Sequence, residues 1–310
     1  MSIIEKAAGR IEHGRQERAP AQARAADSSA AAGPASGDGV GHGHGAATAT
    51  AMPPLPSAPP PPGAPGAPPR RTREVELDLA RMQERGLITV AGGRTLQVED
   101  FRVIKRPILK KAFPGGTAVL PSNLVMITSA LAGEGKTYCS INLAMSIAME
   151  LDHTVLLVDA DVARPSVLKA LGLAPQPGLM DLLLDDSLDL ADVMLRTNVN
   201  TLSILPAGTA NLRATELLAS QSMKALVLEI AQRYPDRIII FDSPPLLLTS
   251  EARVLAGHMG QIVVVVESQQ TTQHAVLEGL RRLEGCDNVS LIYNKSRDFA
   301  GTETYDYHYG

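Results

Sequence analysis

The chain has 310 residues, of which 20% are charged and 3% aromatic, and its formal net charge at pH 7 is −4. This balance gives no bulk attraction to nucleic acid, and two cysteines far apart in sequence provide neither a disulfide framework nor metal-ligand spacing. No apolar run approaches the roughly 18 residues of a membrane span and no signal peptide is recognised, so we expect a cytoplasmic protein that reaches a membrane only through a partner.

The N-terminal region has two kinds of composition. Residues 1–19 place apolar side chains, among them Ile4 and Ile11, at helical spacing, which predicts a short amphipathic helix that either docks on a partner or stays solvated. Residues 20–70 are rich in Ala, Pro and Gly and contain almost no large apolar residues. Such a segment cannot bury enough surface to order itself, so we expect a disordered linker.

Order is expected to return in a domain spanning residues 71–300. Apolar residues from Val75 to Leu87 predict a helix that ends before Gly86. Residues 95–112 predict a second helical segment, broken near Pro107. In this segment Glu99 and Arg102 lie one turn apart on one face, as in a solvated face with a local ion pair.

Residues 123–144 predict a short apolar strand, a glycine-containing loop and a helix. The loop ends in Gly133, Glu134, Gly135, Lys136 and Thr137, the end of the phosphate-binding motif G-x-x-x-x-G-K-[ST]. Glycines let backbone N–H groups approach phosphate oxygens, the lysine reaches the β- and γ-phosphates, and the threonine hydroxyl can ligate Mg²⁺. The first glycine of the motif is replaced by alanine, at residue 130.

Two later strands end in carboxylates. The apolar run 155–158 leads into Asp159 and Asp161, and the strand 237–242 ends in Asp242, which is the Walker B pattern. Neighbouring carboxylates are costly without a cation, and Mg²⁺ would supply it. Because right-handed crossovers bring these strand ends to one edge of a parallel sheet, we predict that the phosphate-binding loop and the two acidic strand ends share one Mg²⁺-nucleotide site.

The remaining elements alternate in type. Helices are expected over 166–196, 215–234 and 272–284, and strands over 202–205, 261–266 and 290–293. This alternation predicts an α/β fold of the P-loop NTPase kind, with a doubly wound, mostly parallel sheet flanked by helices.

Residues 301–310 predict a flexible tail. Three of the six tyrosines, Tyr305, Tyr307 and Tyr309, lie in its last six residues, separated by an aspartate and a histidine. Accessible phenols beside acidic residues suit tyrosine phosphorylation, whereas an aromatic tail that docks on a partner is the alternative. The pattern of residues leaves both open.

With these parts in view, the sequence resembles the bacterial tyrosine autokinases, or BY-kinases, over about residues 72–310. The P-loop of that family usually reads S-x-x-P-G-E-G-K-[ST], and residues 129–137 match it with Ala132 in place of Pro. Its motif D-x-D-x-x-R-P matches 159–165, and its third motif matches 238–242 with Ser-Pro-Pro following. The opening MSIIEKA and the Ala/Pro linker resemble the exosortase-associated autokinases of exopolysaccharide clusters.

The resemblance implies an ATP- and Mg²⁺-dependent kinase that phosphorylates its own tyrosine tail in trans and regulates exopolysaccharide synthesis or export. The implied catalytic residues are Lys136, Asp159, Asp161 and Asp242. The implied ATP-binding residues are Gly133, Glu134, Gly135, Lys136, Thr137 and Tyr138, the metal ligands are Thr137, Asp159 and Asp242, and the phosphate acceptors are Tyr305, Tyr307 and Tyr309.

The resemblance also implies partners. The family's oligomerisation helix carries E-x-x-R-x-x-R, matched by Glu99, Arg102 and Lys105 with Lys in place of the last Arg. A homo-oligomer is therefore implied, with a ring as one form that it can take. The cytoplasmic segment of a transmembrane polysaccharide chain-length regulator is implied as activator and as the route to the inner membrane, and a tyrosine phosphatase as counterpart. No fused regulator is expected in this chain.

Two other functions compete with this interpretation. A ParA/MinD-type switch ATPase without kinase activity would carry a signature lysine early in the loop, where this chain has Leu131, and would lack the tyrosine tail. A non-enzymatic, ATP-dependent scaffold of an export machine is the second alternative. A scaffold without activity would be expected to have lost catalytic acids, but all three motif carboxylates are present in the sequence.

Overall fold

The fold is given by a computed structural model that describes residues 72–113, 120–234 and 236–296. The predictions for 1–19, 20–70 and the tyrosine tail lie outside these residues. The strands are β1 (Arg73–Val75), β2 (Leu124–Ser129), β3 (Thr154–Asp159), β4 (Leu195–Thr197), β5 (Leu202–Leu205), β6 (Arg237–Asp242), β7 (Gln261–Glu267) and β8 (Val289–Asn294).

The helices alternate with these strands, as the sequence predicts. They are α2 (Leu79–Glu84), α3 (Leu96–Ala112), α4 (Lys136–Ala148), α5 (Val167–Leu171), α6 (Leu179–Leu184), α7 (Leu190–Val193), α8 (Ala214–Leu218), α9 (Gln221–Arg233), α10 (Glu251–Ala256) and α11 (Gln273–Arg282).

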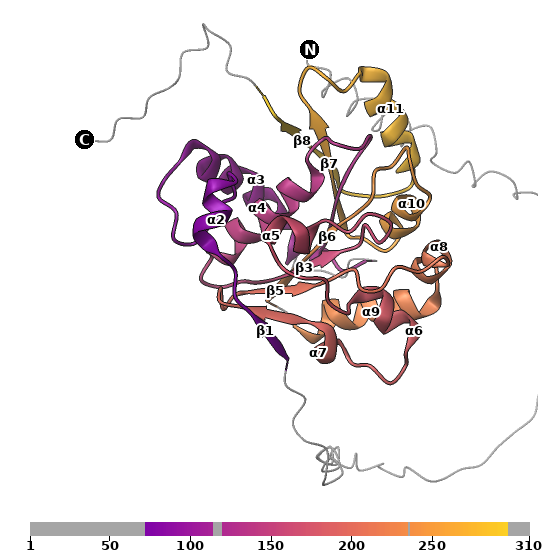
Figure 1. Cartoon of the computed structure of the whole chain (residues 1–310). Helices are drawn as coiled ribbons and strands as arrows, with labels where there is room; N and C mark the ends of the chain where they lie inside the picture. Colours follow the sequence, from indigo (N-terminus) through magenta and orange to yellow (C-terminus); the bar gives the residue numbers. More distant parts are fainter. Residues whose placement is uncertain (1–71, 114–119, 235, 297–310) are drawn as a thin grey trace, which may run out of the picture. The chain divides into compact units, whose positions relative to one another are not determined.

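The described strands form one eight-stranded sheet in the order β1-β4-β5-β3-β6-β2-β7-β8 (Figure 1). All neighbouring pairs are parallel except β4 and β5. The predicted α/β fold with a mostly parallel sheet flanked by helices is therefore confirmed. The order places β3, β6 and β2 side by side, and these are the three strands that lead into the predicted motifs.

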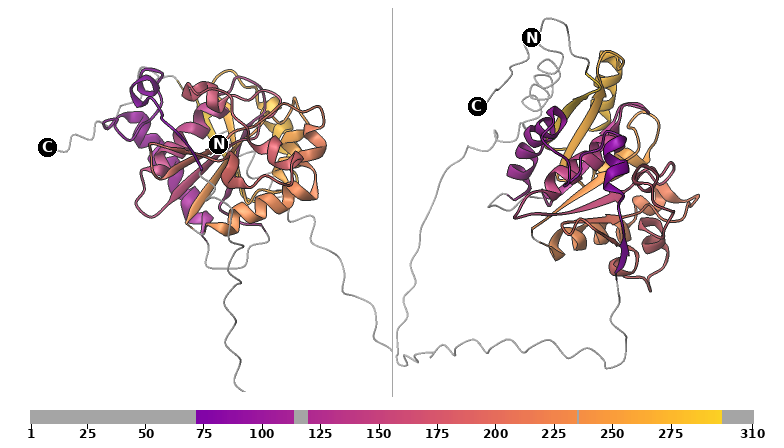
Figure 2. Two further views of the ribbon diagram at one scale, coloured as in Figure 1. Left: turned by 60° about the horizontal axis from the view of Figure 1, so that its bottom comes forward. Right: turned by 60° about the vertical axis from the view of Figure 1, so that its left-hand side comes forward.

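Helices cover both faces of the sheet (Figures 1 and 2). On one face α4 contacts five strands, β2, β3, β5, β6 and β7, and α3 packs on the outer side of α4. On the other face α9 lies against β6. Strand β2 is buried along its whole length, which explains its continuous apolar sequence, since a strand covered on both faces has no polar side.

Helix α3 differs from its prediction because it runs through Pro107 without a break. A proline removes the bond that its N–H would make to the carbonyl four residues earlier, here that of Val103. Val103 is 70% exposed, so water can satisfy the freed carbonyl. On the opposite side of the helix Phe101 and Ile108 are buried in the core and hold the two halves in line.

Other boundaries also differ from the sequence prediction. The expected helix from Val75 begins as the edge strand β1, and helix α2 occupies only its second half. The expected helical region 166–196 ends in the strand β4, and the expected helix 215–234 is interrupted before Ser220, whose hydroxyl caps α9. Each change falls where a short element pairs with or packs on a distant part of the chain, which local periodicity does not report.

Lys105 lies on the inner side of α3. Its side chain is 5% exposed, and its ammonium donates to the carbonyl oxygen of Ser146 at 2.5 Å and pairs with the Glu150 carboxylate at 2.5 Å. The structure therefore separates Lys105 from Glu99 and Arg102, which form an ion pair on the solvent side of the same helix. Lys105 ties α3 to the end of α4.

None of the described helices combines the length and the apolarity that crossing a membrane requires.

The position of Lys105 predicts a role in stability. We expect Lys105→Ala to lower the free energy of unfolding by about 2 kcal/mol, because it leaves the Ser146 carbonyl and the Glu150 carboxylate without their buried donor. Urea unfolding at low protein concentration measures this, with Lys110→Ala on the exposed face as the control. Unchanged stability together with weakened self-association would instead identify Lys105 as an intersubunit contact.

Candidate active site

The site forms where β2, β3 and β6 end. In the sheet register Asp159 at the end of β3 is paired with Asp242 at the end of β6, and Asp242 is also paired with Ile127 of β2. The loop after β2 is the phosphate-binding loop, which leads directly into α4 at Lys136. The parallel register therefore brings two acids and the phosphate-binding loop together, as the sequence predicts.

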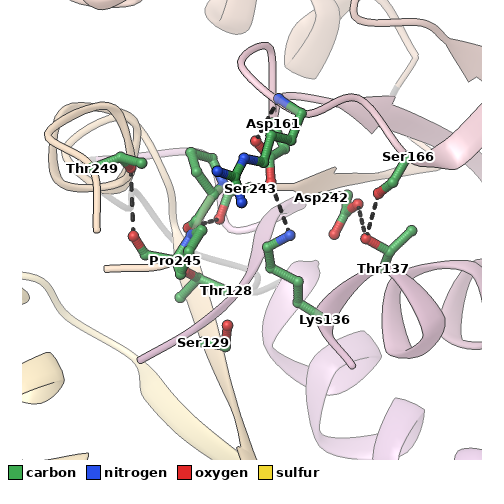
Figure 3. A network of polar contacts seen from close by, with 12 residues as sticks. Thr128, Ser129, Lys136, Thr137, Asp161, Ser166, Asp242, Ser243, Pro245 and Thr249 are labelled. Carbon is green, nitrogen blue, oxygen red and sulfur yellow. Dashed lines mark hydrogen bonds and ion pairs between the residues drawn. The ribbon is translucent and has the colours of Figure 1, made fainter. Parts of the chain in front are cut away.

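Lys136 and Thr137 each contact one of the acids across the site (Figure 3). The Lys136 ammonium lies 2.8 Å from a carboxylate oxygen of Asp161. The Thr137 hydroxyl donates to Asp242 at 2.7 Å and lies 2.7 Å from the hydroxyl of Ser166. The predicted residues are thus linked in one network that joins the first turn of α4 to the ends of β3 and β6.

Asp159 is almost fully buried, with 1% of its surface exposed. One carboxylate oxygen accepts the backbone N–H groups of Ser166 and Val167, at 3.0 and 2.9 Å, while the other oxygen is buried without a hydrogen-bond partner. Burial, and then the neighbouring Asp242 charge, raise the pKa of Asp159 to about 7. A buried acceptor without a donor indicates a group that is prepared for a ligand.

Asp242 is buried as deeply but is better satisfied. Burial raises its pKa to about 6, although the Lys136 charge and hydrogen bonds from the Thr137 and Ser140 hydroxyls act in the opposite direction. Ser140 donates to it at 3.0 Å from the second turn of α4. Two neighbouring carboxylates with raised pKa values mark a place where added positive charge would be stabilised.

The side chains of two predicted nucleotide-binding residues point away from the phosphates' expected position. The buried Glu134 carboxylate accepts hydrogen bonds from the Leu131 N–H and the Thr271 hydroxyl, so it braces the loop from within. The Tyr138 hydroxyl donates to the Gly86 carbonyl and accepts from Gln97. Glu134 and Tyr138 therefore have only their backbone groups available to a nucleotide in this arrangement.

Cys139, the next residue of α4, is 1% exposed. Burial and the nearby Asp242 charge raise the pKa of its thiol to about 12. The thiol therefore packs as a small apolar group.

Several residues of the site were not predicted. Ser140 lies one helical turn after Lys136, and Ser166 follows the Arg-Pro pair of the second motif, so spacing alone could have indicated both. Asn294 and Lys295 also reach the phosphate-binding loop, from the end of β8. In the sequence, these two polar residues directly follow the expected strand 290–293, and this position could have indicated them. The tail tyrosines 305, 307 and 309 lie outside the described residues.

The residues present fit a Mg²⁺-nucleotide. In the described part of the chain no group of three or more His, Cys, Asp or Glu side chains has the arrangement of a metal cage. Magnesium is usually held by one or two carboxylates together with substrate phosphates, which is what the paired Asp159 and Asp242 and the adjoining loop provide. The unpartnered oxygen of Asp159 supplies a free ligand atom.

Fold and site together define a P-loop nucleotide-binding domain, and the AAA domain family matches residues 122–298 of the chain. Tyrosine-protein kinase YwqD of Bacillus subtilis (strain 168) is 33% identical over 212 residues, which cover 68% of this chain and 85% of YwqD. The chain belongs to the bacterial tyrosine-protein kinases, as its motifs predicted.

Two further relatives extend this comparison. The succinoglycan biosynthesis transport protein ExoP of Rhizobium meliloti (strain 1021) is 30% identical over 254 residues, which cover 78% of this chain but 31% of ExoP. The solved VpsO kinase domain is 29% identical, with a TM-score of 0.55, and the match covers 65% of this chain and 97% of that one. The chain spans 22% to 24% of the length of three other curated relatives.

The raised pKa of Asp159 predicts a pH-dependent stability in protein free of nucleotide and divalent metal. Between its ordinary value of 3.8 and about 7, the native state holds a proton that the unfolded chain has lost, so this group's contribution to stability falls as pH rises. We expect Asp159→Asn to gain about 2 kcal/mol relative to wild type between about pH 5 and pH 8.

Urea unfolding across this pH range measures the gain, with the exposed Asp186→Asn as the control. A difference between Asp159→Asn and wild type that stays constant with pH would contradict the raised pKa.

Proposed function

We propose that the protein is an ATP-dependent tyrosine autokinase that phosphorylates Tyr305, Tyr307 and Tyr309 in trans. The observation that carries this proposal is the convergence of Lys136, Thr137, Asp159, Asp161 and Asp242 on one sheet edge. A switch ATPase needs the phosphate loop and one metal-ordering acid, whereas Asp159 adds a second buried carboxylate with an unpartnered oxygen that can accept a proton from a phenol.

In this proposal the loop and α4 hold the triphosphate. Gly133, Glu134, Gly135 and Tyr138 contribute backbone groups, and Lys136 binds the β- and γ-phosphates. The positive φ angles of Gly133 and Gly135, 87° and 94°, permit the turn that points N–H groups inward. The Lys136 ammonium lies 2.8 Å from the Asp161 carboxylate. It would exchange this partner for phosphate oxygens when the triphosphate binds.

Mg²⁺, held by Thr137, Asp242 and Asp159, would neutralise charge on the phosphates. Asp161 supports the metal site through its ion pair with Lys136. The protein's own contribution to the metal site is the buried pair of carboxylates, Asp159 and Asp242, on adjacent strands. The nearby Lys136 forms its ion pair with Asp161.

Asp159 accepts or orients the proton of the incoming phenol. The phenol oxygen forms a bond to the γ-phosphorus as the bond to the β-phosphate oxygen breaks, ADP leaves, and the phenol proton passes to the carboxylate. A free phenol has a pKa of about 10. Asp159 has one buried carboxylate oxygen without a hydrogen-bond partner, and this oxygen is available to accept the proton.

The acceptor tail is proposed to come from a neighbouring subunit. Tyr305 lies ten positions after Lys295, and a chain of this length spans up to about 35 Å when extended, enough to reach beyond the parent domain. The exposed ion pair of Glu99 and Arg102 on α3 offers an intersubunit contact, without Lys105. Each phosphotyrosine adds roughly −1.5 to −2 charges, and the resulting repulsion would release the subunits.

The name of ExoP, a transport protein of succinoglycan biosynthesis, supports a role in exopolysaccharide production. We propose that the kinase acts from the cytoplasm, is recruited to the inner membrane by the cytoplasmic segment of a chain-length regulator, and is reset by a tyrosine phosphatase. The exosortase-associated gene setting remains a prediction from the N-terminal sequence.

A mixing experiment tests both the kinase activity and its direction. Lys136→Met keeps the tyrosines but loses the phosphate ligand, while the triple Phe variant at 305, 307 and 309 keeps the site but loses the acceptors. We expect wild type with ATP and Mg²⁺ to become phosphorylated on tyrosine, each variant alone to show at least about tenfold less signal, and the mixture to label the Lys136→Met chain.

Mass spectrometry with one chain isotopically labelled identifies the acceptor chain. Labelling of wild type but not of the mixture would show transfer within one chain. ATP hydrolysis without any phosphotyrosine, even with an added regulator segment, would move the protein to the switch ATPases.

A further inference from the structure

The end of β8 is attached to the phosphate-binding loop. The Asn294 side-chain amide donates to the carbonyl oxygen of Glu134 at 2.9 Å, and the Lys295 ammonium donates to that of Gly133 at 2.8 Å. Strand β8 is the edge strand, two positions from β2, so this contact crosses over the end of β7. The end of the last described strand, which precedes the tyrosine tail 301–310 in the sequence, therefore touches the loop that binds phosphate.

Lys295 is held in a demanding conformation. Its φ angle is 56°, in the left-handed region that residues other than glycine rarely occupy. In this conformation the ammonium also pairs with Glu267 at the end of β7, at 3.0 Å. The Glu267 N–H in turn donates to the Glu134 carboxylate at 3.4 Å. These contacts close a ring that runs from the loop through β7 and β8 and back to the loop.

The direction of these bonds has a physical reason. A loop that turns its N–H groups toward a phosphate must turn the carbonyl oxygens of the same peptides outward, where they need donors. Asn294 and Lys295 provide donors to two consecutive carbonyls. The approach is close, because a Cβ atom at Gly135 would lie 2.1 Å from the Asn294 amide nitrogen.

We infer that Asn294 and Lys295 are positioning residues that hold the phosphate-binding loop in its binding conformation and couple phosphate binding to the root of the tyrosine-bearing segment. Two carbonyls fixed from outside keep the N–H groups aimed inward before phosphate arrives, so binding does not have to order them. Because coupling is reciprocal, phosphate binding must stabilise the end of β8 as much as the ring favours phosphate. Only the link to tyrosine phosphorylation rests on the proposed function.

Phosphate affinity tests the inference without kinase activity. The full chain is titrated with a fluorescent ADP analogue and Mg²⁺, and inorganic tripolyphosphate, which has no base or sugar, is used as competitor. We expect Lys295→Met to weaken both ligands about three- to tenfold, since a half-exposed charged hydrogen bond is lost. Lys295→Arg should restore most of the affinity, and the exposed Lys224→Met on α9 should bind like wild type.

Hydrogen exchange tests the coupling. In wild type, ADP with Mg²⁺ should slow exchange in the last residues of β8, and in Lys295→Met this protection should be largely lost although the thermal midpoint is kept. Unchanged tripolyphosphate affinity in Lys295→Met would overturn the inference. So would a loss of affinity that Lys295→Arg fails to restore or that accompanies an equal loss in Lys224→Met. A failure of tyrosine phosphorylation alone leaves these measurements unaffected and concerns the proposed function.

Discussion

The constraint on which the site depends is the parallel register that places the carboxylates of Asp159 and Asp242 side by side in the core. Burial and mutual repulsion make such a pair costly in its charged form. The surrounding groups can be understood as compensation for that cost. The first two turns of α4 supply Thr137 and Ser140 to one acid, and two backbone N–H groups before and within α5 serve the other.

The compensation is incomplete on the side of Asp159, where one oxygen has no partner. A fully satisfied pair would be a structural network, stable and inert. An incompletely satisfied pair next to a phosphate-binding loop keeps free energy available for a ligand that brings positive charge. The unpartnered oxygen of Asp159 thus lowers the stability of the domain without ligand and favours the state in which a positively charged ligand is bound.

Helix α4 connects the site to the rest of the domain. Its first turn contacts the segment between α2 and α3 through Tyr138 and Gly86, its middle receives the Ile88 N–H at Asn142, and its last turns hold Lys105 of α3. The solvent side of α3 carries Glu99 and Arg102, so a contact made there is passed to α4 by packed and hydrogen-bonded groups. The nucleotide loop and the outer surface of α3 are therefore connected by hydrogen-bonded groups on this face of the sheet.

The sequence predicted what depends on pattern along the chain. Strand ends with Asp159 and Asp242, the phosphate-binding loop and the alternation of elements were all visible, because parallel topology converts them into proximity. Sequence patterns did not predict features that depend on which side of a helix packs against the rest of the domain. Lys105 matched a motif, but the packing of α3 on α4 buries it. Pro107 was expected to break the helix, but the carbonyl that it leaves without a donor belongs to the exposed residue Val103. The hydrogen bonds from Asn294 and Lys295 to the phosphate-binding loop join residues 160 and 162 positions apart, and no local pattern in the sequence specifies such a pairing.

The burial of Cys139 determines how this part of the domain responds to oxidants. Thiols react with peroxide and with disulfides as thiolates, and a thiol with a pKa of about 12 and 1% exposure offers almost none. A cysteine three residues after the lysine of the phosphate-binding loop could act as a redox switch if its thiol were accessible. In this domain the sulfur is buried in the core, so oxidants cannot reach the thiol nearest Lys136.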